Sequence, residues 1–597
     1  MIDKIDLKNS ISEIEKELEG KKKVSNAISF IRLIVAVIII VYAVKSLSGG
    51  IKPLEGLFAI SGILLFIVFV VMHLKVKYHE RYLNSKIEVL NEYIERLEGK
   101  WVQFNDFGED AINKDHSYSS DLDIFGKGSL FQLINTTKTF LGRLHLVNTL
   151  KGNYDFEKLG IKQEAVKELS SKLDFDIELQ TLGSLNLDQD KDPKFLIDYA
   201  ESRECIHNNK VFKFIIYSLP VILIVFAFLS YLTLSKIFFN ITFVALIINI
   251  ALNGYFLIKG YRGFSKVSPF KKNIKAYLNI IQLIEKAEFK GDYLKEIQFT
   301  FKKDLLGSKV IGKLESIVNC IDLRYNAIAY FILNIIFLWD YQCMFSLEDF
   351  KVRYGNKIGE YLNAIGKLEE VISLSVIEQI NSKTVYPNIE MNKGVFIDAS
   401  KLGHPLIKGE CRITNDISID NEIVIITGSN MSGKTTFLRT VGINLVLAYS
   451  GAPVIAERFS SSIMNILTSM RITDNLEMGI STFYAELIRI KKIIESSKKG
   501  ETMIFLIDEI FRGTNSQDRI LGAKNVIRSL SKNGVIGFIS THDFELCDLE
   551  SANIKNKHFQ EYYENNQILF DYKIKPGMST TKNAKYLMKL VGIDIEE

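Results

Sequence analysis

Two residue types that constrain a chain are scarce in this sequence of 597 residues. It has eight prolines, and so few helix breakers favour long uninterrupted helices. Its five cysteines are scattered, with no C-x-x-C pair, which predicts reduced thiols in a cytosolic setting. Residues 1–28 are charged and helical in pattern, without a short apolar core and a small-residue cleavage site. We therefore expect no cleavable signal peptide.

An excess of one charge sign is also missing. The formal net charge is +4, because 74 Lys and Arg residues nearly balance 70 Asp and Glu residues. Bulk charge therefore gives no evidence for nucleic acid binding, although a local basic face stays open. Apolar residues, in contrast, make up 47% of the chain, and the mean hydropathy of +0.11 is high for a purely soluble protein. Membrane segments are therefore the first feature to look for.

Four apolar runs occur in two pairs, Leu33–Val44 with Gly56–Leu74 and Phe214–Ser235 with Ile237–Ile258. A helix of about 20 apolar residues crosses the hydrocarbon of a bilayer. We therefore predict two transmembrane helical hairpins, over about residues 30–47 and 56–74 and about residues 214–235 and 237–258. The run at 33–44 is short and spans only if its flanking Arg32 and Lys45 reach the interface. The last run carries Asn240, Asn249 and Asn253, which favour a helix–helix contact over lipid.

Basic residues flank both hairpins, while the linkers within the hairpins hold only Lys52 and Lys236. This asymmetry predicts a multi-pass protein of the cell membrane with both termini in the cytoplasm. The alternative is that the four runs are buried helices of a large soluble domain. A fifth run, Ala327–Leu338, is too short to span and is broken by Asn334, so we predict a core helix there.

The rest of the chain changes texture near residue 421. Before it, long helical patterns prevail, including an amphipathic helix over Lys77–Lys100. After it, short β-rich runs (EIVIIT, TMIFLID, GVIGFIS) alternate with helices. This alternation predicts an α/β domain with a mainly parallel sheet, C-terminal to a mainly α-helical core.

The stretch GSNMSGKT fits the pattern G-x-x-x-x-G-K-[ST] and lies between a predicted strand, Ile423–Thr427, and a predicted helix, Thr435–Leu447. Such a loop wraps phosphates with its backbone N–H groups, aided by the helix N-terminus. We expect Lys434 to pair with the β and γ phosphates of ATP and the Thr435 hydroxyl to bind Mg²⁺. The predicted nucleotide-binding residues are Gly428, Ser429, Asn430, Met431, Ser432, Gly433, Lys434, Thr435 and Thr436.

Two further strand ends carry candidate catalytic residues. MIFLIDEI places Asp508 and Glu509 directly after an apolar strand, where side chains face the ligand crevice of a parallel sheet. We expect Asp508 to hold Mg²⁺ and Glu509 to orient and deprotonate the attacking water. In FISTHD, His542 follows another strand and is placed to sense the γ-phosphate. The catalytic candidates are Glu509, His542 and Lys434.

These residues, with several flanking motifs, resemble the MutS family of DNA mismatch repair ATPases over roughly residues 401–592. ITGSNMSGKTTFLRTVG is similar to the family's TGPNMGGKST loop, LIDEIFRGTNSQD to its D-E-x-x-R-G-T run, and GISTFYAEL to its S-T-F-x-x-E segment. STHDFEL, LGHPLI and FDYKIKPGMSTTKNAKYLMKLVGI match further family segments. Residues 116–150, with GSLFQLIN and T-x-T-x-x-G-R, more faintly resemble the entry to its helical core.

The resemblance implies an ABC-like ATPase domain that forms a homodimer around ATP. Ser481, in the place of the ABC signature serine, would then contact the γ-phosphate bound by the other subunit. ATP binding would close the dimer and hydrolysis would open it, moving helices as levers. Double-stranded DNA is an expected partner on the same ground. The domains are then 1–115 (first hairpin and amphipathic helix), 116–205 (start of the core), 206–265 (second hairpin), 266–395 (lever or clamp) and 396–597 (ATPase).

The sequence also departs from the mismatch-detecting members of the family. They carry an N-terminal Phe-x-Glu wedge, for which we expect no room ahead of the first apolar run. The one F-x-E, Phe559-Gln560-Glu561, fits a strand of the ATPase tail better. The pattern looks more like a membrane-associated MutS-like branch without the mismatch-recognition domain, and its DNA binding is inherited by analogy alone.

Two other functions are weighed against this one. A membrane ATPase that clamps a protein in signalling fits the same motifs. An ABC transporter is suggested by Leu47-Ser48-Gly49-Gly50, which resembles LSGGQ. That signature should follow the phosphate loop, however, whereas here it joins two apolar helices. A turn explains its glycines, and a transporter is the weaker alternative.

Overall fold

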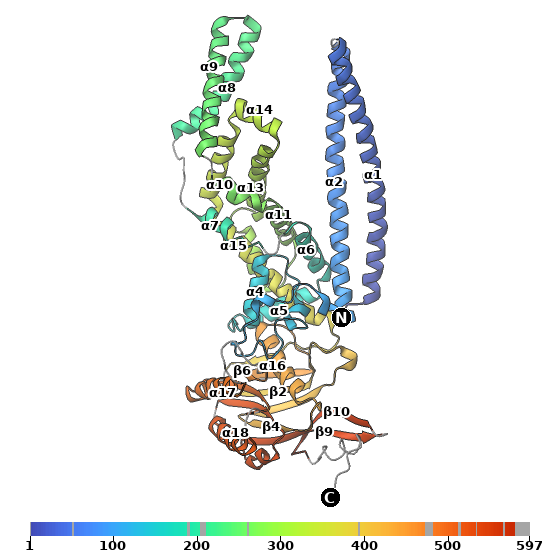
Figure 1. Cartoon of the computed structure of the whole chain (residues 1–597), viewed down its shortest axis with the longest axis vertical. Helices are drawn as coiled ribbons and strands as arrows, with labels where there is room; N and C mark the ends of the chain where they lie inside the picture. Colours follow the sequence, from blue (N-terminus) through green and yellow to red (C-terminus); the bar gives the residue numbers. More distant parts are fainter. Residues whose placement is uncertain are drawn as a thin grey trace.

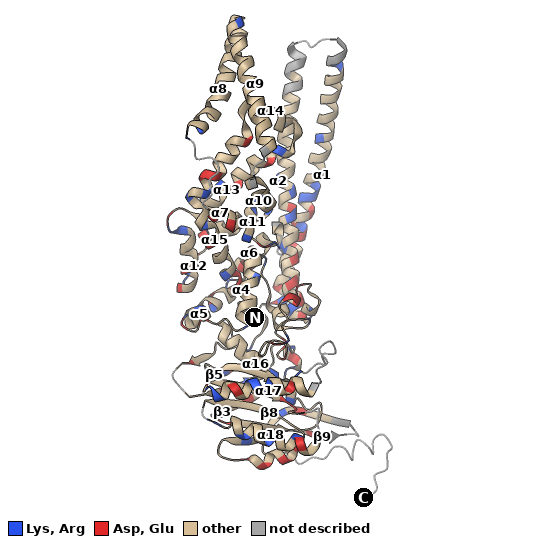
Figure 2. Ribbon diagram, turned by 60° about the vertical axis from the view of Figure 1, so that its left-hand side comes forward, with Lys and Arg blue, Asp and Glu red and all other residues tan. Residues whose placement is uncertain are grey.

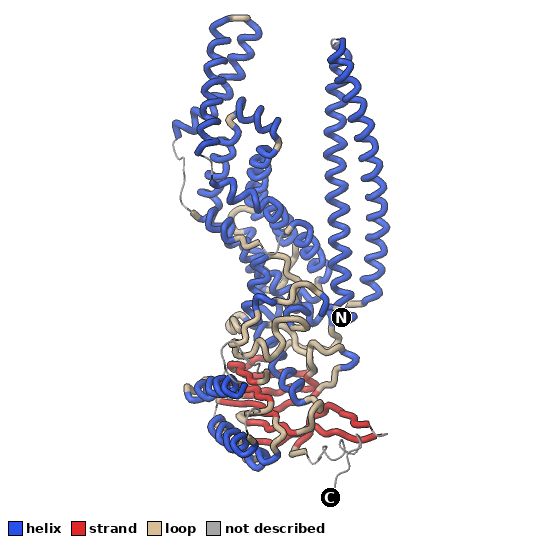
Figure 3. The backbone as a smooth tube through the Cα atoms, viewed as in Figure 1, coloured by secondary structure: helices blue, strands red, loops and turns tan. Residues whose placement is uncertain are grey.

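The computed structural model describes residues 2–49, 53–187, 191–202, 210–259, 262–391, 394–471, 482–511, 515–532, 534–564 and 567–579. The molecule is elongated (Figure 1). An α/β region lies at one end, a helical region follows, and two helical hairpins project from the other end (Figures 1 and 3). The predicted order, a helical N-terminal part followed by an α/β C-terminal part, is therefore confirmed.

The first hairpin consists of α1 (Lys4–Gly49) and α2 (Pro53–Glu98), each one continuous helix of 46 residues. Residues 77–98 of the predicted amphipathic helix form the second half of α2. Here Leu90 and Tyr93 pack with Leu7 of α1 and Ile177 of α6 (Leu173–Asn186). The base of the hairpin is thus anchored on the helical region. Its other half projects freely, and Arg32 of α1 lies over the ring of Phe66 in α2.

The second hairpin consists of α8 (Lys210–Thr233) and α9 (Lys236–Lys259). In the part of the chain that the structure describes, four helices are long and apolar enough to cross a membrane. They lie within Lys4–Lys45, Ser61–Glu98, Lys210–Thr233 and Lys236–Ile258, and a bent pair, Gly307–Tyr325 with Tyr330–Phe337, would make a fifth span. Both hairpins point the same way (Figure 1).

The sequence predicted a core helix at Ala327–Leu338, and this prediction is wrong about the environment of the helix. A helix does form, α14 (Ala327–Phe337), but Ile328 is 75% exposed and Phe331 is 66% exposed. Its other side packs on α8 and α9, where Asn249 and Asn253 donate hydrogen bonds to its last carbonyls. The short length of the run and its break at Asn334 predicted burial, whereas the helix lies beside the exposed apolar hairpin α8–α9.

The helical region is arranged around α15 (Trp339–Ile380), a helix of 42 residues that reaches from the hairpin end to the α/β end (Figure 1). Around it lie shorter helices: α3 (Leu130–Ile134), α4 (Phe140–Leu150), α5 (Leu159–Ser170), α6 (Leu173–Asn186), α7 (Lys194–Glu201), α10 (Arg262–Val267), α11 (Lys271–Lys286), α12 (Asp292–Lys302) and α13 (Gly307–Asp322).

The helices α4 and α15 cross at very short range. A Cβ added at Gly366 of α15 would lie 3.0 Å from the Leu141 carbonyl carbon and 3.1 Å from the Gly142 nitrogen. Beside this crossing, buried Glu369 accepts hydrogen bonds from the Lys138 and Thr139 amides and from the Thr139 hydroxyl. Burial raises the pKa of Glu369 to about 7. The carboxyl group thus satisfies donors at the start of α4, which a helix leaves without partners.

The α/β region contains two sheets. The larger has the strand order β10-β9-β4-β8-β7-β6, in which only β10 runs antiparallel to its neighbour; the smaller has the order β1-β5-β2-β3. The strands are β1 (Asn388–Glu390), β2 (Phe396–Leu402), β3 (Asn415–Asp420), β4 (Ile423–Thr427), β5 (Arg458–Ser462), β6 (Asn465–Ser469), β7 (Met503–Asp508), β8 (Val535–Ser540), β9 (Ile554–Glu564) and β10 (Gln567–Pro576).

Helices cover both faces of the larger sheet. Alternate residues of a strand point to opposite faces, so both faces of these apolar strands are buried. Ile504 and Leu506 of β7 join a core that includes α16 (Lys434–Ser450) and extends into the helical region. Met503 and Phe505 join a second core with α17 (Thr482–Lys498) and α18 (Ser516–Leu530). One apolar core therefore runs from the sheet to α15.

We expect Gly366→Ala to lower the midpoint of thermal unfolding of the detergent-purified chain. The new methyl group meets backbone atoms of α4 that cannot turn aside, and such overpacking costs about 1–3 kcal/mol. The matched control is Gly160→Ala in α5, where an added Cβ has no atom within 4 Å. Equal midpoints for the two variants, followed by circular dichroism, would contradict a close α4–α15 crossing.

Candidate functional site

Three neighbouring parallel strands end at one edge of the larger sheet, in the order β4, β8, β7. The predicted phosphate loop follows β4, His542 follows β8, and Asp508 and Glu509 lie at the end of β7. Because β8 lies between the other two strands, His542 stands between the loop and the acidic pair. The structure therefore brings together residues that are more than a hundred positions apart in the sequence.

The loop Gly428–Gly433 turns directly into α16, whose first residue is Lys434. Gly433 has φ +105°, a conformation that L side chains rarely adopt, and this residue lets the loop enter the helix. Lys434 Nζ donates to the carbonyls of Gly428 and Ser429, both at 2.8 Å. Burial lowers the pKa of Lys434, while the carboxylates of Glu509, Asp508 and Glu561 act in the opposite direction. The ammonium is thus held inside the loop.

The remaining loop residues differ in exposure. Asn430 and Thr436 are exposed, and the Met431 side chain is 85% exposed, so it points away from the loop. Ser432 is buried, and its hydroxyl oxygen has no hydrogen-bond partner. A buried hydroxyl without a partner in a loop of inward-facing donors fits an anionic ligand, since an unsatisfied buried polar group costs free energy.

Asp508 lies next to the start of α16. Thr435 Oγ1 donates to Asp508 Oδ2 at 2.7 Å, and the Ser540 hydroxyl donates to Asp508 Oδ1. A hydroxyl and a carboxylate side by side are hard oxygen ligands of the kind that Mg²⁺ takes in phosphate sites, where waters and phosphates complete its shell. Among the described residues there is no group of three or more His, Cys, Asp or Glu that could hold a metal. The residues fit a cation that binds together with a phosphate ligand.

Glu509 and His542 form a pair in this site. His542 Nε2 lies 3.0 Å from Glu509 Oε1 and 3.5 Å from Lys434 Nζ. Glu509 has φ +54°, unusual for a residue with a side chain, and its amide donates to the Ser540 carbonyl at 3.1 Å. Strained backbone of this kind persists where the surroundings fix it, often at functional sites.

One contact of the loop could not be expected from the motifs. Ser429 Oγ donates to Glu561 Oε2 of β9 at 2.9 Å, and Glu561 is buried. Phe559 and Glu561 lie in β9, so the F-x-E triplet is part of a strand, as expected. The family loop TGPNMGGKST has proline where Ser429 stands, and this serine is the one signal in the sequence for the contact.

A pocket of about 280 Å³ adjoins the loop at Gly433 and Thr436. Its walls come from three segments outside the motif: the loop after β2, the start of β3 and the tail strands. They include Leu402, His404, Ile407, Ile413, Phe559 and Tyr572. Burial lowers the pKa of His404 to about 4, so its ring is neutral at pH 7. LGHPLI had pointed to His404, but no sequence pattern singled out Tyr572, whose ring lies against Gly433.

Several predicted residues lie outside the described residues. They are Ser481, the run Arg512–Thr514 and the tail from residue 580 onward. Glu486, from the same segment as Ser481, is described. Its carboxylate accepts a hydrogen bond from the amide of Phe511 and so links α17 to the strand end that carries Glu509.

The α/β region is tied to residues 116–125 by two aspartates. Asp121 accepts hydrogen bonds from the Thr468 hydroxyl, the Met470 and Arg471 amides and the Arg489 guanidinium. Asp123 accepts one from Arg439 of α16 at 2.9 Å and forms an ion pair with Arg471. An ion pair between Arg439 and Asp123 thus links α16 to residues 116–125, the segment that leads into the helical region.

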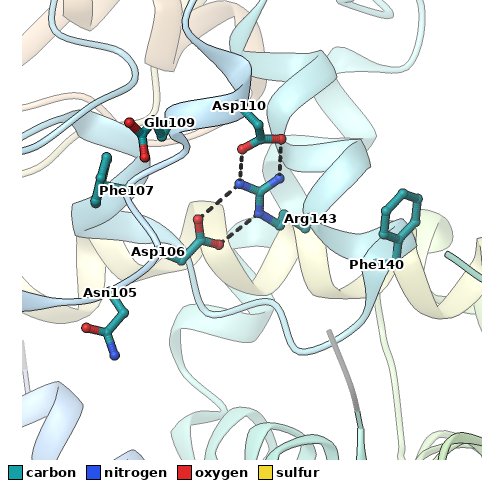
Figure 4. A pocket seen from close by; sticks show the side chains of 7 residues that line it. All are labelled: Asn105, Asp106, Phe107, Glu109, Asp110, Phe140 and Arg143. Atoms are coloured by element: carbon teal, nitrogen blue, oxygen red, sulfur yellow. Dashed lines mark hydrogen bonds and ion pairs between the residues drawn. The ribbon is translucent and has the colours of Figure 1, made fainter. Parts of the chain in front are cut away.

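A wider pocket of about 560 Å³ belongs to another part of the fold. It lies between residues 105–110 and α4, and Arg143 occupies its wall (Figure 4). Arg143 donates to both oxygens of Asp106 and of Asp110 (Figure 4). Its charge is therefore already matched by two carboxylates, and the pocket shares no residue with the cluster around Lys434.

Comparison with known proteins points to one family. The family model for MutS domain V matches residues 424–593, which include the whole cluster from Gly428 to His542. The C-terminal part of this chain therefore resembles MutS domain V. Its MutS-type domain comprises β4 to β10 with α16 to α18, and the site residues lie within it.

The curated proteins that are similar to this chain are DNA mismatch repair proteins MutS. The chain is 29% identical over 241 residues to the DNA mismatch repair protein MutS of Methanococcoides burtonii, covering 38% of this chain and 27% of the relative. It is 34% identical over 197 residues to that of Thermotoga petrophila, covering 32% and 25%, and 29% identical over 266 residues to that of Aquifex pyrophilus, covering 43% and 30%. The match thus spans between a quarter and a third of these relatives' length.

Proposed function

We propose that this chain is a membrane-anchored MutS-like ATPase, in which ATP binding between two copies drives a clamp-like movement of the helical region. The observation that carries the proposal is the convergence of Lys434, Thr435, Asp508, Glu509 and His542 at one edge of a parallel sheet, inside a MutS-type domain. A loop with inward donors, a cation-binding pair and a base candidate are the parts that phosphoryl transfer to water requires.

Each residue then has a role set by its position. Lys434, at the inner face of the loop, binds the β and γ phosphates. Glu509 orients and deprotonates the attacking water, and His542 holds the Glu509 carboxylate in place and lies toward the γ-phosphate. Mg²⁺, held by Thr435 and Asp508, would supply charge stabilisation at the phosphates. Ser481 of the partner subunit completes the γ-phosphate site in the dimer.

The pocket beside Gly433 suits the nucleotide base. It opens next to the start of α16, where the phosphates would bind, and offers aliphatic and aromatic walls. A base needs such flat apolar contact, with few polar groups to fix its orientation. We assign Tyr572 and Ile413 to this base contact.

The movement has a continuous route through the described residues. Arg439 of α16 holds Asp123, and α16 also packs on α4. The α4 helix crosses α15 at Gly366, and α15 runs on toward the hairpins. A displacement of α16 on nucleotide binding would therefore be transmitted to α15 by packed backbone, which deforms little.

The membrane anchor is supported by surface composition. In the most apolar window of each candidate span, at most 17% of the residues are buried inside the protein. Soluble proteins rarely expose apolar patches of this extent. Outside the grey parts, the projecting halves of both hairpins carry few charged residues, whereas the helical region carries many (Figure 2). A cell-membrane location with the ATPase domain and both termini in the cytoplasm follows from this proposal and from the basic flanks.

The binding partner of the clamp is proposed from the similarity of this chain to its curated relatives. The curated relatives are named DNA mismatch repair proteins, so we propose double-stranded DNA, without mismatch selectivity. A protein partner at the membrane is the alternative. Lysines of the helical region support DNA only weakly, because Lys271 is paired with Asp322. The LSGG segment gives no support to a transporter, since Leu47–Gly49 end α1 at the hairpin tip, far from β4 (Figure 1).

We expect Glu509→Gln to bind ATP normally but to hydrolyse it at least about 100-fold more slowly, because the base that activates water is lost. The trapped nucleotide should hold the full chain as a dimer in detergent, measured by mass photometry and by retained radiolabelled ATP. Glu410→Gln, at an exposed carboxylate of the same region, is the control. A variant that neither retains ATP nor dimerises contradicts nucleotide-driven closure.

Tyr572→Ala should weaken ATP binding roughly fivefold, because loss of an aromatic contact costs about 1 kcal/mol. Tyr572→Phe, which keeps the ring, should bind ATP like the wild type. Inorganic triphosphate has no base and should bind all three proteins equally, as measured by calorimetry. If triphosphate binding falls together with ATP binding, Tyr572 acts on the phosphate loop and the base assignment is wrong.

DNA binding is tested with detergent-purified full chain on matched, mismatched and branched duplexes, with and without ATP, at several salt concentrations. We expect ATP-dependent binding that weakens with salt, because contacts to phosphates release counterions. We also expect equal affinity for matched and mismatched duplexes. Selectivity for a mismatch would contradict the proposed binding without mismatch selectivity, and no binding to any duplex would reject DNA in favour of the protein partner.

A further inference from the structure

The helix α14 (Ala327–Phe337) has an apolar face that no other part of the described structure covers. Ile328, Phe331 and Ile332 are 75%, 66% and 48% exposed. The helix is made of apolar residues except for Tyr330 and Asn334. Its other side packs on α8 and α9, and it lies beside that hairpin (Figure 1). Apolar residues of α8 and α9 are exposed as well.

The C-terminal end of α14 is capped by side chains of its neighbours. A helix leaves its last four carbonyls without backbone partners. Here Asn253 Nδ2 donates to the Asn334 carbonyl at 2.6 Å, and Asn249 Nδ2 donates to those of Ile335 and Ile336 at 2.9 and 3.3 Å. Gln342 Nε2 donates to the Phe337 carbonyl at 2.6 Å. All four carbonyls are therefore satisfied within the protein.

This complete capping distinguishes α14 from an ordinary surface helix. Water would satisfy the same carbonyls at no cost in an aqueous setting, so the four hydrogen bonds from three side chains would be unnecessary there. In a bilayer each unsatisfied backbone group costs several kcal/mol, and a helix that ends at membrane depth needs partners inside the protein. Two of these three donors, Asn249 and Asn253, lie on the apolar helix α9. A polar side chain in lipid is itself costly unless it has a partner inside the protein.

The depth of α14 follows from the positions of its caps on α9. Asn249 and Asn253 lie 13 and 17 residues from Lys236, which is about 20 and 26 Å along the helix at ~1.5 Å per residue. The hydrocarbon of a bilayer is about 30 Å thick. If the hairpin tip at Leu234–Ser235 lies at the far surface, α14 ends near the boundary between acyl chains and headgroups on the side of the ATPase domain.

We propose that α14 is a re-entrant membrane segment that lies in the lipid headgroup–acyl boundary, with Ile328, Phe331 and Ile332 in contact with lipid. The inference rests on the proposed membrane anchor and extends it to a helix too short to span. Since α14 leads directly into α15, the long helix that reaches the ATPase domain then starts in the bilayer. Lipid contact and nucleotide state would act on the two ends of one helix.

The test uses the wild-type full chain in phosphatidylcholine vesicles that contain a lipid with a diazirine on its acyl chain. After illumination, lipid adducts are mapped to peptides by mass spectrometry, once with the diazirine near the ester and once near the chain end. We expect α9 peptides around Ile247 and Ile250 to react with both lipids. The α14 peptide should react several-fold more with the shallow diazirine, and the α18 peptide with exposed Leu521 should stay at background.

The outcomes separate the two proposals. Adducts on α9 with only background on α14 would overturn the re-entrant segment and leave the membrane anchor intact. Background on α9 would overturn the anchor itself.

Variants test the caps in the same assay. Asn249→Leu combined with Asn253→Leu removes three of the bonds to α14 and should reduce its adducts several-fold while α9 keeps its own. Asn240→Leu, at an exposed asparagine nearer the hairpin tip, is the matched control and should leave α14 unchanged. Equal α14 labelling in the double variant and the control would contradict the capping argument.

Discussion

The crossing of α4 over α15 is the contact on which the arrangement of this molecule depends. Two glycines, Gly142 and Gly366, let the helix backbones approach each other. The buried Glu369 carboxyl accepts hydrogen bonds from two backbone amides at the start of α4. An apolar side chain at position 369 could pack there, but it would leave those amides unsatisfied, at a cost of about 1–3 kcal/mol each. The same crossing joins the two ends of the molecule, because α4 contacts α16 on one side and α15 leads to the hairpins on the other.

Motif-bearing parts of the fold were predictable from the sequence, because their patterns are local. Strand β4, the loop at Gly428 and the start of α16 are contiguous, and the acidic pair follows an apolar strand directly. The spacing of apolar residues and the glycines of the turn suffice to predict such local units. The rule that ligands bind at the carboxyl ends of parallel strands predicted only that these residues face one ligand crevice. The order β4-β8-β7, which places His542 between Lys434 and Glu509, was not predicted, because it depends on pairing between distant strands.

Contacts between distant segments were not predictable in this way. Nothing in the local pattern of β9 indicates that Glu561 meets Ser429, since the two residues are joined only by sheet pairing. Tyr572 reaches the pocket through the antiparallel strand β10. The environment of α14 was predicted wrongly because an apolar run of its length is compatible with a core or with a lipid boundary. The side chains that cap α14, Asn249 and Asn253, distinguish these two environments, and they lie about eighty residues earlier on α9.

The candidate nucleotide site at one end and the apolar hairpins at the other would give the proposed motor a moving part and a fixed anchor. The central claim is that ATP binding in a dimer displaces α15. It is tested most directly by pulsed electron resonance between spin labels at Val352, an exposed position of α15, introduced through a genetically encoded amino acid. In vesicles, ATP should produce a distance distribution between the two copies that differs from that of the nucleotide-free protein. An identical distribution in both states, or no distance between copies with ATP, would contradict the account.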